Sequence, residues 1–185
     1  IVREMTDLLV FDLVDKRHVT DQMVLTVGYD IENLKNPDIK KLYHGQVTTD
    51  HYGRSVPKSA HGSINLGRQT SSAKLIMNAV TELFERIVDK NLLVRRVNIA
   101  ANHVVDEATI KKEDIIEQLD LFTDYAAVKA EKEEEEAELE REKKLQQAML
   151  EIKKKYGKNA VLKGMNLEEG ATTLERNKQI GGHKE

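Results

Sequence analysis

Two groups of polar side chains in this 185-residue chain have the types and spacing needed to hold a phosphate backbone. The first group occupies alternate positions of one segment and consists of Ser59, His61, Ser63 and Asn65. The second group is the pair Arg95 and Arg96, and Arg68 stands between the two groups. Hydroxyl, imidazole, amide and guanidinium groups donate hydrogen bonds to phosphate oxygens, and such contacts position a nucleic acid without reading its bases. These residues are therefore a candidate nucleic-acid-binding surface. The alternative is the solvated face of an ordinary sheet.

Catalytic, nucleotide-binding and metal-binding interpretations fail on spacing. The segment 62–68 spaces its glycines like a phosphate-binding loop, but Arg68 and Gln69 stand where that loop needs Lys and Ser or Thr. Gly67 is expected to serve a turn instead. The histidines at 44, 51 and 61 match no standard metal spacing, and the acidic pair 106–107 fits a solvated strand end. We expect no catalytic residue, no metal site and no cofactor in this chain.

Alternating helices and strands must position the polar groups. The expected elements are helices over 1–17 and 73–87 and strands over 22–29, 57–67 and 92–105. Thr70, Ser71 or Ser72 is expected to cap the second helix. In the last strand, Asn98 and Asn102 should share the exposed face with Arg96. The connection over 30–56 is long, and long ordered connections tend to be functional.

This order of elements predicts an α+β fold, with an antiparallel sheet and two helices on one of its faces. The order becomes β-α-β-β-α-β if one strand precedes Ile1, so we expect the first strand to be absent and the chain to be a fragment. In the ferredoxin-like strand order, the missing strand lies between the strands at 57–67 and 92–105. The gap would leave unpaired strand edges, through which a homodimer could form.

Composition limits the function further. Charged residues make up 33% of the chain, the net charge is −3, and there is no cysteine, which excludes disulfides and Cys-based zinc sites. No apolar run reaches transmembrane length and no signal peptide is visible, so we expect a cytoplasmic, nucleoid-associated protein with no membrane partner. The stretch 51–81 contains four bases and no acid, whereas 131–142 is strongly acidic. Such a local basic patch can steer phosphate ligands.

The second half of the chain is predicted to consist of appendages. We divide the chain into a folded domain over 1–105, a linker over 106–123, a charged helix over 124–156 and a flexible tail over 157–185. Glu/Lys pairs four residues apart support an exposed helix. Its narrow apolar stripe consists of Leu145, Met149, Ile152 and Tyr156. The stripe could dock on a partner or on the domain, or it could stay in solvent.

A pentapeptide in the linker has a composition suited to binding another protein. It consists of Gln118, Leu119, Asp120, Leu121 and Phe122. The Gln amide can both donate and accept in a polar notch. Burial of Leu121 and Phe122 in an apolar pocket would contribute about 1.5–3 kcal/mol each. The pentapeptide resembles the QL(S/D)LF peptide with which bacterial replication and repair proteins bind the DNA sliding clamp. A chance match on an amphipathic segment is the alternative.

A wider resemblance covers nearly the whole chain. Its motifs are the stretch HYGRSVPKSAHGSINLGRQTSSAKLI, the strand start Leu93-Val94-Arg95-Arg96-Val97 and the clamp-like pentapeptide, in this order. Together they resemble Y-family translesion DNA polymerases of the UmuC/ImpB/MucB/SamB branch. The part that is matched is the little finger domain with the C-terminal tail.

The resemblance implies a binding role in DNA repair and translesion synthesis. In this family the little finger holds the template–primer duplex by its backbone, so DNA and the sliding clamp are the implied partners. The family's paired arginines correspond to Arg95 and Arg96, and its Ser/Gly/Arg-bearing strand corresponds to Ser63–Arg68. A further basic residue of the family is Ala100 here, which puts the strength of this strand's contact in doubt. The catalytic carboxylates and their Mg²⁺ belong to a palm domain that this chain lacks.

Two other classes of function remain open. An RNA-binding module could have the same order of elements, but such modules normally stack bases on strand aromatics, and none is expected on these strand faces. A helical protein-interaction adaptor would explain the charged helix over 124–156. It would leave the polar strand faces and the pentapeptide unexplained.

Overall fold

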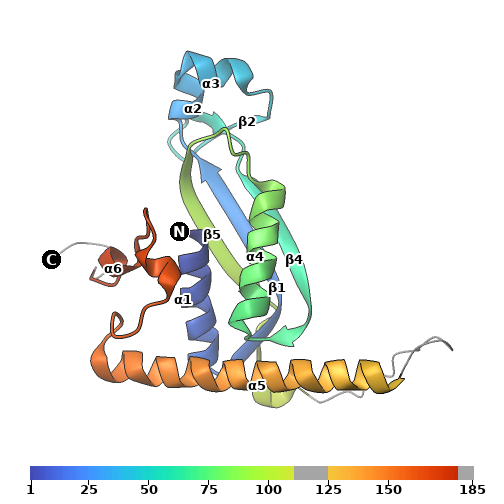
Figure 1. The fold of residues 1–185 in the computed structure, drawn as a ribbon. Coiled ribbons are helices and arrows are strands. Elements are labelled where there is room, and N and C mark those ends of the chain that lie inside the picture. Colours follow the sequence, from blue (N-terminus) through green and yellow to red (C-terminus); the bar gives the residue numbers. More distant parts are fainter. Residues whose placement is uncertain (111–124, 179–185) are drawn as a thin grey trace.

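The computed structural model describes residues 1–110 and 125–178 and confirms an α+β fold with an antiparallel sheet (Figure 1). The sheet strands are β1 (His18–Tyr29), β4 (Ala60–Thr70), β5 (Val94–Asn102) and the short β6 (Val105–Asp106). The helices α1 (Val2–Asp15) and α4 (Ala73–Ile87) pack against each other and against the sheet. Each of these long elements lies where the sequence pattern predicts one.

The core lies between the two helices and one face of the sheet. Met23, Leu25 and Val27 alternate along β1 and are completely buried. Their partners from the helices are Val10, Leu13, Ile76, Val80 and Leu83. Burying one such side chain contributes about 1.5–3 kcal/mol. Because successive side chains of a strand point to opposite faces, the even-numbered residues of β1 point away from the helices.

The strand order corrects the expected topology. The sequence argument left a gap for a missing strand between the strands over 57–67 and 92–105. Instead, β1 lies between them: Met23 is opposite Ile64 of β4 and Ala101 of β5, in antiparallel pairings. The predicted gap is therefore wrong, because β1 is 12 residues long and pairs with both neighbours in the order β4-β1-β5. The expected homodimer through exposed sheet edges stays a prediction.

The start of α4 follows the expected capping chemistry. Ser72 is the N-cap, and its hydroxyl accepts the backbone N–H of Leu75 at 3.2 Å. The apolar stripe predicted for this helix faces the core, with Ile76, Val80 and Leu83 buried. Near the other end of the helix, Arg86 donates to the backbone carbonyl of Ser63 at 2.9 Å, so the helix also contacts the edge strand β4.

The long connection after β1 folds into an insert at one end of the sheet. Its elements are α2 (Glu32–Lys35), α3 (Pro37–Leu42) and a hairpin of β2 (Val47–Thr49) and β3 (Ser55–Pro57). Asn33 is completely buried. Its side-chain amide makes two hydrogen bonds with the backbone of Leu93, in place of the backbone of a neighbouring strand. Its amide donates to the Leu93 carbonyl at 2.9 Å and accepts the Leu93 N–H at 2.8 Å. The insert is thus fixed to the start of β5.

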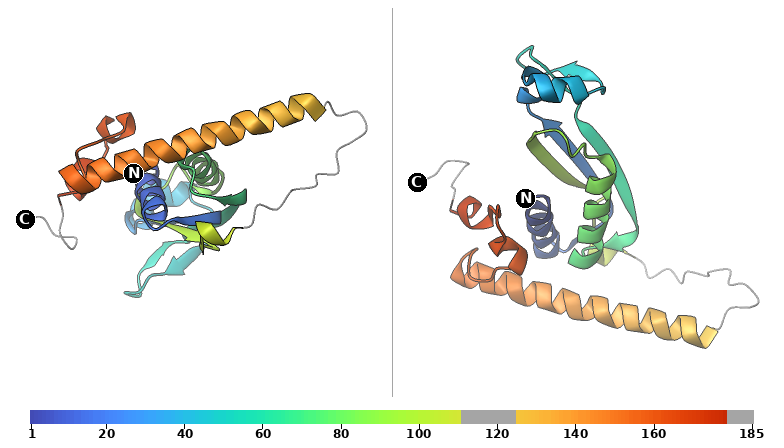
Figure 2. Two further views of the ribbon diagram at one scale, coloured as in Figure 1. Left: turned by 90° about the horizontal axis from the view of Figure 1, so that it is seen from below. Right: turned by 45° about the horizontal axis from the view of Figure 1, so that its top comes forward.

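A long helix, α5 (Tyr125–Tyr156), crosses the opposite end of the domain, past the start of α4 and the end of α1 (Figures 1 and 2). Its polar side makes the contact. Glu142 accepts the backbone N–H of Lys74 at 2.9 Å and the hydroxyl of Ser72 at 2.5 Å. The buried Gln146 donates to the carbonyl of Ser71 at 3.3 Å. The helix therefore docks through hydrogen bonds and charge.

Three of the four residues in the apolar stripe of α5 are exposed, whereas Met149 is half-buried. Leu145, Ile152 and Tyr156 are 62%, 39% and 68% exposed. Of the alternatives left open by the sequence, docking of these three residues on the domain is wrong. The adaptor function that such a stripe would serve stays a prediction.

The segment after α5 packs against α1, where the sequence predicted a flexible tail. Its short helices are η2 (Gly164–Leu167) and α6 (Thr173–Arg176). The buried Glu4 accepts the backbone N–H groups of Thr172 at 3.1 Å and Thr173 at 2.9 Å, together with both hydroxyls. Burial raises the pKa of Glu4, but these hydrogen bonds outweigh it and lower the pKa from 4.5 to about 2. Buried Asp7 also pairs with Lys163. The segment is thus tied to α1 at two buried carboxylates.

Candidate nucleic-acid interface

Figure 2 shows that one face of the sheet is turned away from α1 and α4. The pairing of the strands places mostly polar side chains on this face. Its rows across β4, β1 and β5 are Ser59, Gly28 and Arg96; His61, Thr26 and Asn98; Ser63, Val24 and Ala100; and Asn65, Gln22 and Asn102. None of these residues is a carboxylate. We call this surface the open face.

Side-chain hydrogen bonds order two rows of the open face. Gln22 donates to Oδ1 of Asn65 at 2.8 Å and accepts from Nδ2 of Asn102 at 2.9 Å. In the neighbouring row, Oγ1 of Thr26 lies 2.8 Å from Nδ1 of His61. Within the described part of the chain, Nδ2 of Asn65 and Nε2 of His61 have no partner. They remain free to meet a ligand at a surface that is already ordered.

The structure brings together most of the residues that the sequence singles out. Those on the open face are Ser59, His61, Ser63, Asn65 and Arg96. The expected neighbours Asn98 and Asn102 also lie there. The side chain of Arg96 is exposed and forms no ion pair with any described residue. The other described residues of β5 on this face are Asn98, Ala100 and Asn102, which carry no charge. Arg96 is therefore the residue through which β5 places a positive charge on the open face.

Arg95 lies at the margin of the open face. The pairing register shifts between Gly28 and Tyr29, so Arg95 has no place in the rows that contain Arg96. Its guanidinium instead pairs with Asp30 at 3.3 Å. The pKa of Asp30 is lowered, chiefly by the hydrogen bond from the backbone N–H of Glu32 and also by Arg95. The positive charge of Arg95 is thus partly balanced by a carboxylate.

Arg68 was predicted to belong to the same surface, but the structure places it away from the other predicted residues. Between Asn65 and Thr70 the strand β4 bulges away from its pairing with β1. Gly67 has a φ of +77° in this bulge, a conformation that glycine adopts freely, as expected for turn geometry. The bulge directs Arg68 to α5, where it forms an ion pair with Glu135. Its charge therefore faces an acidic helix.

Sequence reasoning missed the residues that β1 contributes. Gln22, Thr26 and Gly28 form the middle of the open face, between the two strands that the sequence identified. Their alternation with the buried Met23, Leu25 and Val27 was a usable signal. It was not used because the expected topology placed this strand at an edge of the sheet.

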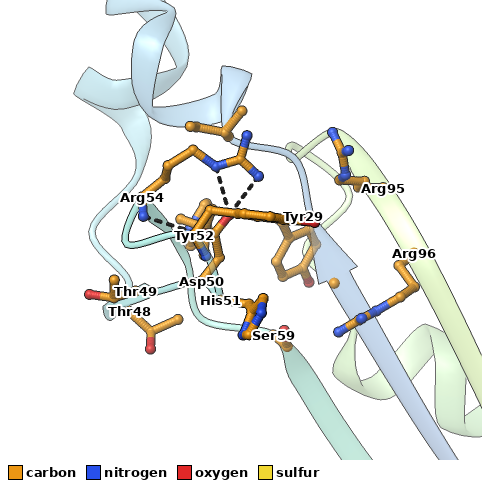
Figure 3. A pocket seen from close by; sticks show the side chains of 14 residues that line it. Tyr29, Thr48, Thr49, Asp50, His51, Tyr52, Arg54, Ser59, Arg95 and Arg96 are labelled. Carbon is orange, nitrogen blue, oxygen red and sulfur yellow. Dashed lines mark hydrogen bonds and ion pairs between the residues drawn. The ribbon is translucent and has the colours of Figure 1, made fainter.

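A groove of about 400 Å³ lies where the open face meets the insert (Figure 3). The hairpin β2–β3 lines it with His51 and Tyr52, and the sheet lines it with Ser59 and Arg96. We call it the hairpin groove. Sequence analysis identified only its sheet side, because the hairpin residues come from the long connection over 30–56.

Several expectations fall outside what the structure describes. The clamp-like pentapeptide Gln118–Phe122 lies outside the described residues. Among the residues that are described, no group of His, Cys, Asp and Glu side chains could hold a metal ion. No helix within the described ranges is long and apolar enough to cross a membrane.

Comparisons with known proteins add no family assignment. Family models, curated proteins and solved structures all give no significant match to this chain. The proposals below therefore depend on the sequence motifs and on the geometry of the open face.

Proposed function

We propose that the chain binds the sugar–phosphate backbone of duplex DNA on its open face. The observation that supports this most strongly is a wide polar surface without a carboxylate, on which Arg96 is exposed and has no ion-pair partner among the described residues. Backbone contacts position a nucleic acid without reading its sequence. Gly28, Ser63 and Ala100 have little or no side-chain bulk, so a phosphate backbone can approach the strands closely.

The open face favours duplex backbone over base stacking. Modules that bind single-stranded RNA on a sheet stack bases on strand aromatics. The rows of the open face contain no aromatic ring except the imidazole of His61, which is hydrogen-bonded to Thr26. The RNA-binding alternative therefore has little support on this surface.

The proposed biological setting is translesion synthesis and DNA repair. In this proposal the chain is the little finger and C-terminal tail of a Y-family polymerase, and it supplies DNA binding without catalysing nucleotide addition. The support is the order of motifs from 51 to 122, together with helices packed on one side of an antiparallel sheet. The catalytic carboxylates and their Mg²⁺ would belong to another domain of the complete protein.

The pentapeptide Gln118–Phe122 is proposed to bind the bacterial sliding clamp as an extended segment. It lies outside the described ranges, which end at residue 110 and begin again at residue 125. A short motif that orders on binding should have an affinity on the order of micromolar. Replacing both Leu121 and Phe122 with Ala should remove most clamp binding without changing the melting temperature. Clamp binding that survives this double change would contradict the proposal.

Titration of the full chain with blunt DNA duplexes tests the main proposal. Because Arg96 lies on the open face and Arg95 at its margin, log K should fall against log salt with a slope of roughly −1 to −2, equally for unrelated sequences. Ser63→Asp adds a carboxylate in the middle of the open face and should weaken binding about tenfold. Gln147→Glu adds the same charge on the exposed side of α5 and serves as the matched control. Equal affinities for the two variants would overturn the assignment of the open face.

A further inference from the structure

The hairpin groove adjoins the open face, because Ser59 and Arg96 belong to both (Figure 3). The side chains that it offers to a ligand are Thr48, Thr49, His51, Tyr52, Ser59 and Arg96. Its volume of about 400 Å³ falls in the range of sites for small ligands, roughly 300–1,000 Å³. A ligand lying on the open face would therefore reach the groove without leaving the protein surface.

The hairpin side of the groove presents an aromatic ring to solvent. Tyr52 is 77% exposed, although it is held in place by its neighbours. The guanidinium of Arg54 lies 4.9 Å from the centre of its ring, and the ring of His51 meets it edge-on at 5.4 Å. An exposed aromatic ring beside a cationic groove is the arrangement on which proteins stack the bases of single strands.

The hairpin turn is ordered before any ligand binds. Oδ1 of Asp50 accepts the backbone N–H groups of Tyr52 and Arg54, both at 2.9 Å. Asp50 also forms an ion pair with the Arg54 guanidinium at 2.7 Å, and this contact lowers the pKa of Asp50 and raises that of Arg54. Gly53 closes the turn with a φ of +75°. Because the turn is already fixed, a ligand loses little affinity to ordering it.

The sheet side of the groove supplies one unbalanced positive charge. Arg54 is paired with Asp50 and Arg95 with Asp30. Arg96 forms no ion pair with a described residue. Arg96 and Ser59 both lie next to Gly28: a Cβ atom placed on Gly28 would be 3.6 Å from the Cβ of Arg96 and 3.7 Å from the hydroxyl oxygen of Ser59. One guanidinium with a hydroxyl nearby matches a single phosphate.

We propose that the hairpin groove binds one unstacked nucleotide of a single strand that continues from a duplex on the open face. The base stacks on Tyr52 beside His51, and the adjoining phosphate contacts Arg96 and Ser59. This inference rests on the proposed function for the position of the duplex. It adds that the chain distinguishes a duplex with a single-stranded extension from a blunt one.

The test compares ligands on the full chain. The ligands are a blunt duplex, the same duplex with a short thymidine extension, and the extension strand alone. Stacking of one base is worth about 1–3 kcal/mol, so the extension should tighten binding by about tenfold. A 2-aminopurine at the first unpaired position should lose fluorescence on binding, because its emission falls when it stacks.

Matched tyrosine variants locate the effect. Tyr52→Ala should abolish the gain from the extension and the fluorescence change, while blunt-duplex affinity stays the same. Tyr156→Ala is the control, because Tyr156 is 68% exposed and has Lys155 over its ring at 5.2 Å, but lies on α5. An extension that still tightens binding to Tyr52→Ala would overturn the proposal.

A third variant fills the groove without removing a side chain. The contacts available to a Cβ at Gly28 are ordinary, and valine suits a central strand, so Gly28→Val should fold normally. Because Gly28 also lies on the open face, the gain from the extension is measured against the affinity of the same variant for the blunt duplex, and it should fall at least threefold.

The three ligands separate failure of this inference from failure of the proposed function. Blunt-duplex binding with no gain from the extension would refute the groove and keep the open face. Binding of the single strand alone, dependent on Tyr52 and without duplex binding, would refute the open face and keep the stacking site.

Discussion

Basic side chains at the two ends of the sheet have opposite surroundings. At the end near α5, Arg68 pairs with Glu135 and Lys74 pairs with Glu138 at 2.9 Å. At the end near the insert, Arg96 is exposed and has no such partner among the described residues. Basic residues that look alike in the sequence therefore differ in what they can bind. Of these three bases, Arg96 is the one without a carboxylate partner among the described residues.

The difference comes from contacts that are distant in sequence. The stretch 51–81 contains no acid, so its bases look available. The balancing carboxylates come from α5, where Glu135, Glu138 and Glu142 follow one another along one side of the helix. The hydrogen bond with Glu138 accordingly raises the pKa of Lys74. The acidic run over 131–142 was expected to be solvated. Two of its carboxylates instead form ion pairs with Arg68 and Lys74 of the domain.

The largest expected effect concerns the contact between Glu4 of α1 and the segment that follows α5, and this contact depends on pH. The folded pKa of Glu4 is about 2, below its ordinary 4.5, so its stabilisation is complete above pH 4.5 and is lost as the pH falls toward 2. A hydrogen bond to a charged group is worth about 1.5–3 kcal/mol. The protection factors of the amides over 164–176, corrected for the intrinsic pH dependence of exchange, should therefore fall across this window. Glu4→Gln should remove the pH dependence, and unchanged protection at pH 2.5 would contradict this account.

The next largest effect should separate the two groups of bases directly. Arg96→Glu removes a phosphate contact and adds repulsion, so duplex affinity should fall about tenfold or more. Arg68→Glu should lower it less than about threefold, because Glu135 already neutralises this side chain. Fluorescence anisotropy with the same duplex measures both. Equal losses would mean that DNA displaces α5 from Arg68, and the comparison between the two ends would fail.

A smaller effect is expected on stability at the start of α4. Glu142→Gln keeps the shape of the side chain but removes the negative charge next to the N-terminus of a helix. Such charges are worth about 0.3–1 kcal/mol, so the free energy of unfolding in urea should fall by about this amount. Glu151→Gln, at an exposed position of α5, is the matched control. A larger loss for Glu151→Gln would contradict the contact assigned to Glu142.

The smallest effect on stability is expected for the ion pair between Arg68 and Glu135. Its partners Arg68 and Glu135 are 41% and 53% exposed, and such pairs are worth about 0–1 kcal/mol. Arg68→Ala should therefore change the unfolding free energy by less than about 0.5 kcal/mol, with Lys58→Ala as the comparison. A much larger loss would show that the bulge of β4 needs this contact.

The sequence was sufficient for local structure and insufficient for arrangement. Alternation correctly separated Ala60 and Ile64 from His61 and Ser63, because side-chain direction in a strand depends only on position. The predicted strand order was wrong, because strand order depends on which distant segments pair. The prediction also required a strand before Ile1, whereas β1 pairs with both β4 and β5. The pairing of Arg68 with Glu135 joins residues 67 positions apart, and no local pattern indicates it.

The two ties made by Glu4 and Asp7 have a consequence for the integrity of the protein. A chain cut at an engineered protease site between residues 110 and 125 would have no covalent link between the domain and α5. The pieces would still meet at Glu4, Asp7 and the start of α4, through buried carboxylates and the contacts of Glu142. We expect the two pieces to elute together near neutral pH and to separate in acid. Cohesion of this molecule thus does not require an unbroken backbone.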